Sequence, residues 1–246
     1  MSERVVAMIP ARAGSTRLKL KNLALLRGKP LIAYAIDAAL RSGVFSRVVV
    51  NGDHPAFEDV AERYGAAFYL RPPEHGTSDA RSDAVVYDFL AHHPCDAVAW
   101  VNPIAPLQPA DEIRSVVRAF FERGLDSMIT VATHQVHAVL NERPVNFVAD
   151  EPFALTQDLD PVHTFAYSVM MWRAAPFIAA YERDGYAVLN GRVGYLPVSR
   201  RSGIIVKTAD DLRLADALLA AESGGDVEYD PLADRILGGS RAAHAE

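Results

Sequence analysis

Apolar runs of strand length alternate with helical patterns along the first 133 residues, and few folds accommodate that order. The first run is Val5–Ile9, and further strands are predicted at 47–51, 67–70, 97–101 and 127–133. After the first run, apolar residues recur at helical spacing until Ser42-Gly43 supplies a stop, and later helices are predicted at 56–64, 79–92 and 111–122. This alternation predicts a doubly wound α/β fold, with helices on both faces of a mostly parallel sheet.

The second half of the chain breaks this alternation. Residues 135–163 are rich in Pro, Asn and Asp, which predicts an insertion or an extended hairpin. A strand at 165–172 then returns to the core, and Thr208 is expected to begin a final helix that runs to residue 221. We therefore predict an α/β core of residues 1–134 and 164–222, an insertion at 135–163, and a flexible C-terminal tail at 223–246.

Composition narrows the class of protein. A chain of 246 residues with 50% hydrophobic content can bury one sizeable α/β core. Its single cysteine, Cys95, excludes an intramolecular disulfide and is expected to be a buried small hydrophobe. The sequence contains no run of about 20 apolar residues and no signal-peptide pattern, so we expect a cytoplasmic protein without membrane association. The net charge of −6 argues against a nucleic-acid partner.

Positive charge is nevertheless concentrated near the N-terminus. The loop after Val5–Ile9 places four basic residues around the pair Gly14-Ser15. Glycine and serine allow backbone N–H groups to approach phosphate oxygens, and the basic side chains neutralise their charge, so a triphosphate is the natural ligand. The loop matches neither the P-loop nor the dinucleotide fingerprint, and by itself it is equally consistent with a solvated basic surface.

Four motifs follow one another in the order of a known family. They are Ile-Pro-Ala-Arg-x-Gly-Ser-x-Arg-Leu-x-x-Lys-Asn at 9–22, Val-Val-Val-Asn-Gly-Asp at 48–53, Arg-Pro-Pro-Glu with Ser-Asp-Ala-Arg-Ser at 71–82, and Trp-Val-Asn-Pro-Ile-Ala-Pro-Leu at 100–107. In this order they resemble the cytidylyltransferases that activate acidic sugars, the CMP-sialic acid synthetase family. The resemblance implies a fold of the nucleotide-diphospho-sugar transferase type. It also implies that residues 135–163 pair two subunits in a homodimer.

The resemblance also implies a reaction. In the family, the anomeric hydroxyl of an acidic sugar attacks the α-phosphate of CTP, giving a CMP-sugar and pyrophosphate. By analogy, Arg12, Lys21 and Lys207 are the expected catalytic residues, and Asn102, Gln108 and Tyr167 the expected sugar-binding residues. The expected nucleotide-binding residues are Arg12, Ser15, Arg17, Lys21, Asn22, Arg71 and Ser82. CTP and an acidic sugar are the expected partners.

The sequence departs from the family where Mg²⁺ is usually bound. Relatives carry Ile-Asp-Ile-Asp-Thr, whose two aspartates face the same side of a strand, whereas this chain has Ile205 and Lys207 at those positions. Lys207 would then neutralise phosphates directly, or Mg²⁺ would be held by the nucleotide with Asp53 or Asp211 assisting, or transfer activity has been lost. Asp53 is equally suited to capping the following helix, and Asp211 is expected in the first turn of the last helix.

The sugar side departs as well. Phe165-Ala166-Tyr167-Ser168-Val169 replaces the family's Arg-Pro-Asn-Gly-Ala, and Gln108 replaces an arginine. A changed set of polar partners predicts an acceptor other than sialic acid, with other nonulosonates, 3-deoxy-octulosonates and phosphonates all open. Two alternatives remain: a non-catalytic nucleotide- or sugar-binding relative, and a transferase that uses another nucleotide on a sugar phosphate.

Overall fold

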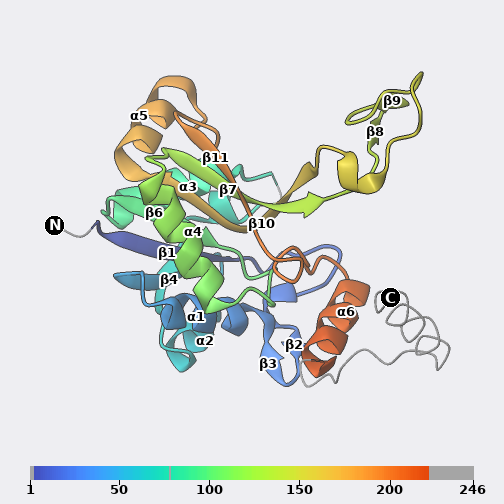
Figure 1. Ribbon diagram of the computed structural model, residues 1–246. Coiled ribbons are helices and arrows are strands. Elements are labelled where there is room, and N and C mark those ends of the chain that lie inside the picture. Colours follow the sequence, from blue (N-terminus) through green and yellow to red (C-terminus); the bar gives the residue numbers. More distant parts are fainter. Residues whose placement is uncertain (1–2, 78, 222–246) are drawn as a thin grey trace, which may run out of the picture.

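The computed structural model describes residues 3–77 and 79–221, and its centre is a seven-stranded sheet (Figure 1). The strand order is β11-β7-β10-β6-β1-β4-β5. The strands span Val5–Ala11 (β1), Arg47–Gly52 (β4), Ala67–Leu70 (β5), Ala97–Val101 (β6), Ser127–His134 (β7), Val162–Arg173 (β10) and Val193–Pro197 (β11). All pair in parallel except β10, which runs antiparallel to both β6 and β7. The predicted mostly parallel sheet is confirmed.

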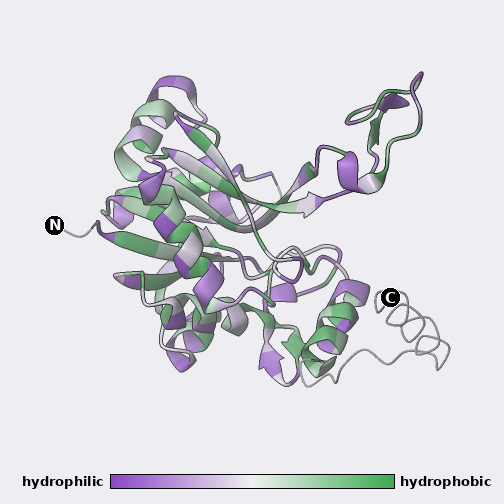
Figure 2. Cartoon of the chain, in the orientation of Figure 1, coloured by the Kyte–Doolittle hydropathy of each residue, from purple (hydrophilic) through white to green (hydrophobic). Residues whose placement is uncertain are grey.

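Helices cover both faces of this sheet. One face carries α1 (Leu31–Ser42), α2 (Phe57–Arg63) and α4 (Ala110–Glu122), and the other carries α3 (Ser82–His92) and α5 (Ala174–Asp184). Strand β1 lies between them, with Ala7 and Ile9 packed toward α1 and α4, and Val6 and Met8 toward α3 and α5. A strand buried on both sides has no polar face, which is why β1 is a continuous apolar run (Figure 2). The predicted doubly wound architecture is confirmed.

Local signals set several helix ends as predicted. Gly43 ends α1 in the left-handed conformation, at φ 69°, where a side chain would be strained. Thr208 is the N-cap of α6 (Ala209–Ala220), and it forms a capping box with Asp211. Helix α3 is shorter than predicted: it begins at Ser82 rather than residue 79, because Arg81 is still extended.

Two segments project from this core. A short antiparallel pair, β2 (Leu25–Leu26) and β3 (Lys29–Pro30), lies beside α6, which packs on it through an apolar cluster. An arm between β7 and β10 extends away from the sheet and ends in the hairpin of β8 (Val139–Leu140) and β9 (Arg143–Pro144) (Figure 1). Single 3-10 turns lie at Lys21–Leu23, Pro73–Gly76 and Thr156–Asp158.

Three further predictions concern Cys95, membrane association and the C-terminal tail. Cys95 is half-buried beside the α3–α5 cluster, and burial raises the pKa of its thiol to about 11. Within residues 3–77 and 79–221, no helix is both long and apolar enough to cross a membrane. The tail at 223–246, predicted to be flexible, lies outside the described residues.

Candidate active site

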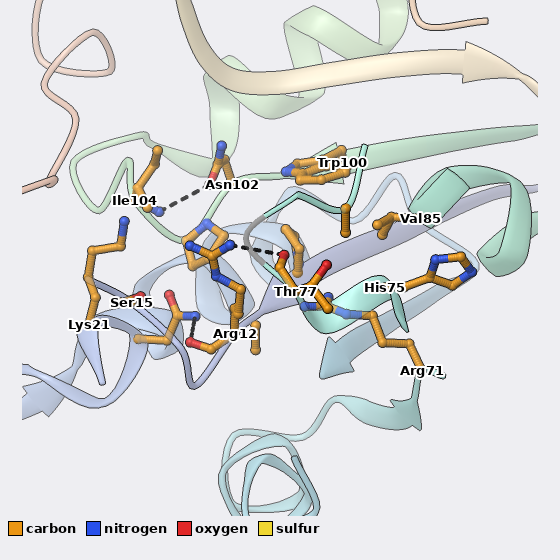
Figure 3. Close-up of a pocket in the computed structure, with 15 residues that line it drawn as sticks. Arg12, Ser15, Lys21, Arg71, His75, Thr77, Val85, Trp100, Asn102 and Ile104 are labelled. Atoms are coloured by element: carbon orange, nitrogen blue, oxygen red, sulfur yellow. Dashed lines mark hydrogen bonds between the residues drawn. The ribbon is translucent and has the colours of Figure 1, made fainter. Parts of the chain in front are cut away.

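A cavity of about 240 Å³ opens where β1 and β6 end at their carboxyl ends (Figure 3). That edge of a parallel sheet is where α/β folds bind ligands. The cavity brings together six of the residues singled out from the sequence: Arg12, Ser15, Lys21, Asn22, Arg71 and Asn102. The remaining lining is Pro10, Ala11, His75, Thr77, Ala80, Val85, Trp100, Pro103 and Ile104.

The basic loop is held in place from outside its own sequence. The backbone N–H of Ala13 donates to Oδ1 of Asp53 at 2.9 Å, and Arg12 Nη1 donates to the carbonyl of Thr77 at 3.2 Å. Asn22 Nδ2 donates to the carbonyl of Arg12 at 3.5 Å, while its Oδ1 is buried without a hydrogen-bond partner among the described residues. The loop is therefore fixed on both sides, and one buried acceptor is left for a ligand.

The loop gathers positive charge at the cavity. Desolvation lowers the pKa of Lys21, and the charges of Arg17, Arg12 and Lys207 lower it further. Asp211 opposes the shift, but it is the smallest of these influences. An anion bound here would relieve the mutual repulsion of the four cations, so the site is suited to a group of high negative charge.

Arg71 forms a rigid part of the cavity wall. Only 5% of it is exposed, its Nη1 donates to the carbonyl of Asn51 at 2.8 Å, and its Nη2 lies 3.9 Å from Oδ2 of Asp53. Burial lowers the pKa of Arg71, and Asp53 raises it again. Its Nε is buried and has no partner among the described residues. The guanidinium therefore retains one donor for a ligand.

Asp53 is committed to this framework. One of its oxygens accepts from the loop and the other faces Arg71. A Cβ added at Gly76 would lie 2.7 Å from the Cβ of Asp53, so the 3-10 turn that contains Gly76 packs directly against this carboxylate. Asp53 thus joins the basic loop to Arg71, and neither oxygen is free of these contacts.

Trp100 is a cavity residue that the motif analysis did not select. Its indole forms one wall near Val85 (Figure 3), and its Nε1 is buried without a hydrogen-bond partner in the described part of the chain. A buried donor of this kind costs stability unless a ligand accepts from it. Its position two residues before Asn102, near the carboxyl end of the parallel strand β6, was the signal that could have identified it. His75 and Thr77 had no such signal, because a loop brings them to the cavity.

Besides Arg17, Lys207, Asp53 and Asp211, three predicted residues do not line this cavity: Ser82, Gln108 and Tyr167. Ser82 is the first residue of α3, two positions after the lining residue Ala80. Gln108 is buried beside α4, where its Nε2 donates to Glu112 at 3.4 Å, and it lines a separate hollow of about 330 Å³. Tyr167 lies at a bulge in β10 with φ 54°, and its ring packs edge-on against Phe165 at 5.4 Å. Ligand contacts by these three side chains remain predictions.

The segment that replaces the family's aspartates lies next to the cavity. The backbone N–H of Val206 donates to the carbonyl of the lining residue Ile104 at 2.8 Å. Asp211 accepts three hydrogen bonds at Oδ2, from the backbone N–H groups of Lys207 and Thr208 and from the Thr208 hydroxyl. These bonds, led by the one from Lys207, hold the pKa of Asp211 below its usual range.

These contacts test whether the chain can hold the Mg²⁺ that the family implies. The two usual ligand positions carry an alkyl group and an ammonium, and both candidate substitutes, Asp53 and Asp211, are engaged by hydrogen bonds or an ion pair. Across the described ranges, no three His, Cys, Asp or Glu side chains gather as a metal site would require. This donor set does not fit a divalent ion held by the protein.

Comparison with known proteins identifies the family. The model of the family described as "Cytidylyltransferase" matches residues 6–170, which include every element that builds the cavity wall described above. The chain belongs to the cytidylyltransferase family. The resemblance to the CMP-sialic acid synthetase family is thereby confirmed.

Individual relatives agree with this assignment. The chain is 37% identical over 125 residues to the N-acylneuraminate cytidylyltransferase of Escherichia coli O18:K1:H7, covering 49% of this chain and 29% of that protein. It is 40% identical over 120 residues to the CMP-N,N'-diacetyllegionaminic acid synthase of Legionella pneumophila, covering 46% of this chain and 52% of that one. The chain thus spans about half or less of the length of these curated relatives.

Solved structures show the same fold. A CMP:2-keto-3-deoxy-manno-octonic acid synthetase complexed with CTP superposes with a TM-score of 0.66 at 18% identity, over 89% of this chain and 99% of that chain. The 4-diphosphocytidyl-2C-methyl-D-erythritol synthase of Anaerococcus prevotii gives 0.65 at 14% identity, over 89% and 100%. At these identities the likeness concerns the fold.

Proposed function

We propose that this cytidylyltransferase transfers CMP from CTP to the hydroxyl of an acidic sugar or sugar-like acid and releases pyrophosphate. The observation that carries the proposal is the convergence of Arg12, Ser15 and Lys21 in one cavity, where crowded positive charge lowers the pKa of Lys21. A triphosphate fits that charge, and a relative of known fold was solved with CTP bound. The family assignment favours cytosine over other bases.

Catalysis in this proposal comes from positioning and from charge. The acceptor oxygen bonds to the α-phosphorus, the bond from that phosphorus to the bridging oxygen breaks, pyrophosphate leaves, and the hydroxyl proton passes to solvent. Arg12 and Lys21 stabilise the negative charge that grows on the α-phosphate and on the leaving pyrophosphate. Ser15 and the loop backbone hold the outer phosphates, and Arg17 lies close enough to add its charge.

The other predicted site residues are assigned to contacts with either the nucleotide or the acceptor. Asn22 and Arg71 contact the nucleotide through their unpartnered Oδ1 and Nε atoms, and Ser82 faces its base or ribose. Asn102 contacts the acceptor from the end of β6, where its own backbone N–H donates to the carbonyl of Ser168 at 2.9 Å. Because Tyr167 and Gln108 stand where the family carries other polar groups, the acceptor differs from sialic acid in the substituents that those groups would contact.

Assembly and location belong to the same proposal. We infer that the arm pairs two copies in a homodimer, because it exposes large apolar side chains, with Phe153 77% exposed. We also infer a cytoplasmic location, which cell fractionation with an antibody against the chain would test.

The test is pyrophosphate release by the purified protein, with each of the four nucleoside triphosphates and a panel of acidic sugars. We expect release with CTP and with one or a few acids. We expect Arg12→Ala to abolish it while the protein stays folded, since among the described residues the Arg12 side chain makes one hydrogen bond, to the carbonyl of Thr77. Release with a purine nucleotide would favour a transferase of another kind. CTP binding without release from any acid would favour a non-catalytic relative, which the missing aspartates make the second candidate.

A further inference from the structure

Lys207 stands where the family places a metal-binding carboxylate. Backbone contacts fix the position of residues 205–207. The hydrogen bond from Val206 to Ile104 attaches this segment to the cavity rim. Val206 is fully buried in the cluster under α6, while Lys207 is exposed. The Val206 side chain thus lies in the apolar cluster, whereas the Lys207 side chain is left outside it and faces solvent.

The charge of Lys207 acts on the same group as the loop cations. It lowers the pKa of Lys21, as Arg17 and Arg12 also do. Lys207 therefore lies within electrostatic reach of the cavity's phosphate-binding end. Asp211 accepts from the backbone N–H of Lys207 at 2.9 Å, and this bond fixes the backbone that carries the ammonium.

A carboxylate-held cation and an ammonium supply the same thing to a polyphosphate, namely positive charge. At this position, exchange of two carboxylates for Ile205 and Lys207 removes two negative charges and adds a positive one. The charge that relatives recruit from a divalent ion is here built into the chain. The contacts of Asp53 and Asp211 agree with this, because Asp53 faces both the basic loop and Arg71, and Oδ2 of Asp211 already accepts three hydrogen bonds.

We propose that Lys207 neutralises the triphosphate of the bound nucleotide in place of a divalent ion held by the protein. The inference rests on the proposed function, and it makes nucleotide binding largely independent of added Mg²⁺. It also assigns Lys207 to direct contact with substrate phosphate rather than to the fold.

Calorimetry of CTP binding, in excess EDTA and in excess Mg²⁺, tests this. The wild-type protein should bind CTP in EDTA within about 3-fold of its affinity in Mg²⁺. Lys207→Ala should weaken binding in EDTA by about 10- to 100-fold, the loss of one charge-assisted contact. Arg213→Ala is the matched control: it removes one positive charge from α6, at a side chain 76% exposed and paired with Asp210, and should leave affinity unchanged.

A double variant, Ile205→Asp with Lys207→Asp, supplies the complementary test. It recreates the paired carboxylates, so it should bind CTP only when Mg²⁺ is present. Wild-type binding that requires Mg²⁺ and is unaffected by Lys207→Ala would overturn this inference and leave the proposed function intact. Absence of CTP binding under both conditions would overturn both. Circular dichroism confirms that each variant is folded before it is compared.

Discussion

Lys21 lies among positive charges whose repulsion is strengthened by its own burial. Its pKa falls below the usual 10.5 first because of desolvation, and then because of Arg17, Arg12 and Lys207. Only the protonated ammonium attracts phosphate. A lowered pKa therefore brings the loss of this charge to a lower pH than for a lysine in water.

The first prediction follows from that sign. CTP affinity should fall as the pH rises through the lowered pKa of Lys21, because the neutral amine no longer binds phosphate. Lys21→Arg keeps its charge throughout and should show a weaker decline. Calorimetric titrations from about pH 7 to about pH 10 compare the two proteins. Parallel declines in both would show that another group governs the pH dependence.

The second prediction concerns the side chain of Trp100. Its buried Nε1 has no partner in the described chain, so a ligand is the group that can accept from it. Trp100→Phe keeps an aromatic wall and removes the donor. We expect about 5- to 10-fold weaker binding of CTP or of the acceptor, with the free energy of unfolding unchanged or slightly raised. Affinities for both ligands at wild-type values would mean that bound ligand leaves this donor unpaired.

The helices and strands whose apolar residues recur at regular spacing follow from the sequence. Those whose apolar pattern is interrupted by Gly or Pro do not. Strand β11 was missed because Gly194 and Pro197 weaken a strand pattern. Strand β11 lies at the edge of the sheet, where both residues are tolerated. Glycine is also required at position 194, because a Cβ there would overlap the side chain of Leu125. Helix α5 was missed although Pro176 in its first turn and the pair Phe177 and Ala180 were a usable signal.

The third prediction concerns the stability of helix α6. Its start depends on the Thr208–Asp211 capping box, and Thr208→Ala should lower the free energy of unfolding by about 1 kcal/mol. The pKa of Asp211 is lowered in the folded protein, so its contribution is present above its unfolded pKa and is lost as the pH falls through the folded value. Denaturant unfolding at several pH values should therefore show Asp211→Asn destabilised near neutrality and equal to wild type in acid. A gap that persists in acid would contradict this assignment.

For the whole molecule, the residues of the basic loop that gather in the cavity follow from the sequence better than the surroundings of the residues expected to bind the acceptor. Arg12, Ser15, Lys21 and Asn22 belong to one contiguous loop, so a single motif predicts all four, and all four line the cavity. The acceptor end depends on long-range geometry that no local pattern records. The bulge that turns Tyr167 to positive φ arises from the pairing of β10 with β7, and the wall at His75 and Thr77 from a loop that returns to the cavity.

The arm gives the last prediction, which tests the proposed homodimer. Leu140 and Phe153 are 67% and 77% exposed on an arm that extends away from the core (Figure 1), and burying such side chains favours association by about 2 kcal/mol each. Leu140→Ser with Phe153→Ser should shift a dimer toward monomer in light scattering over a dilution series. Tyr186→Ser, at a side chain 64% exposed on the core, is the control and should leave the mass unchanged. A wild-type monomer at all concentrations would exclude pairing through the arm, and an arm variant that stays dimeric would place the interface elsewhere.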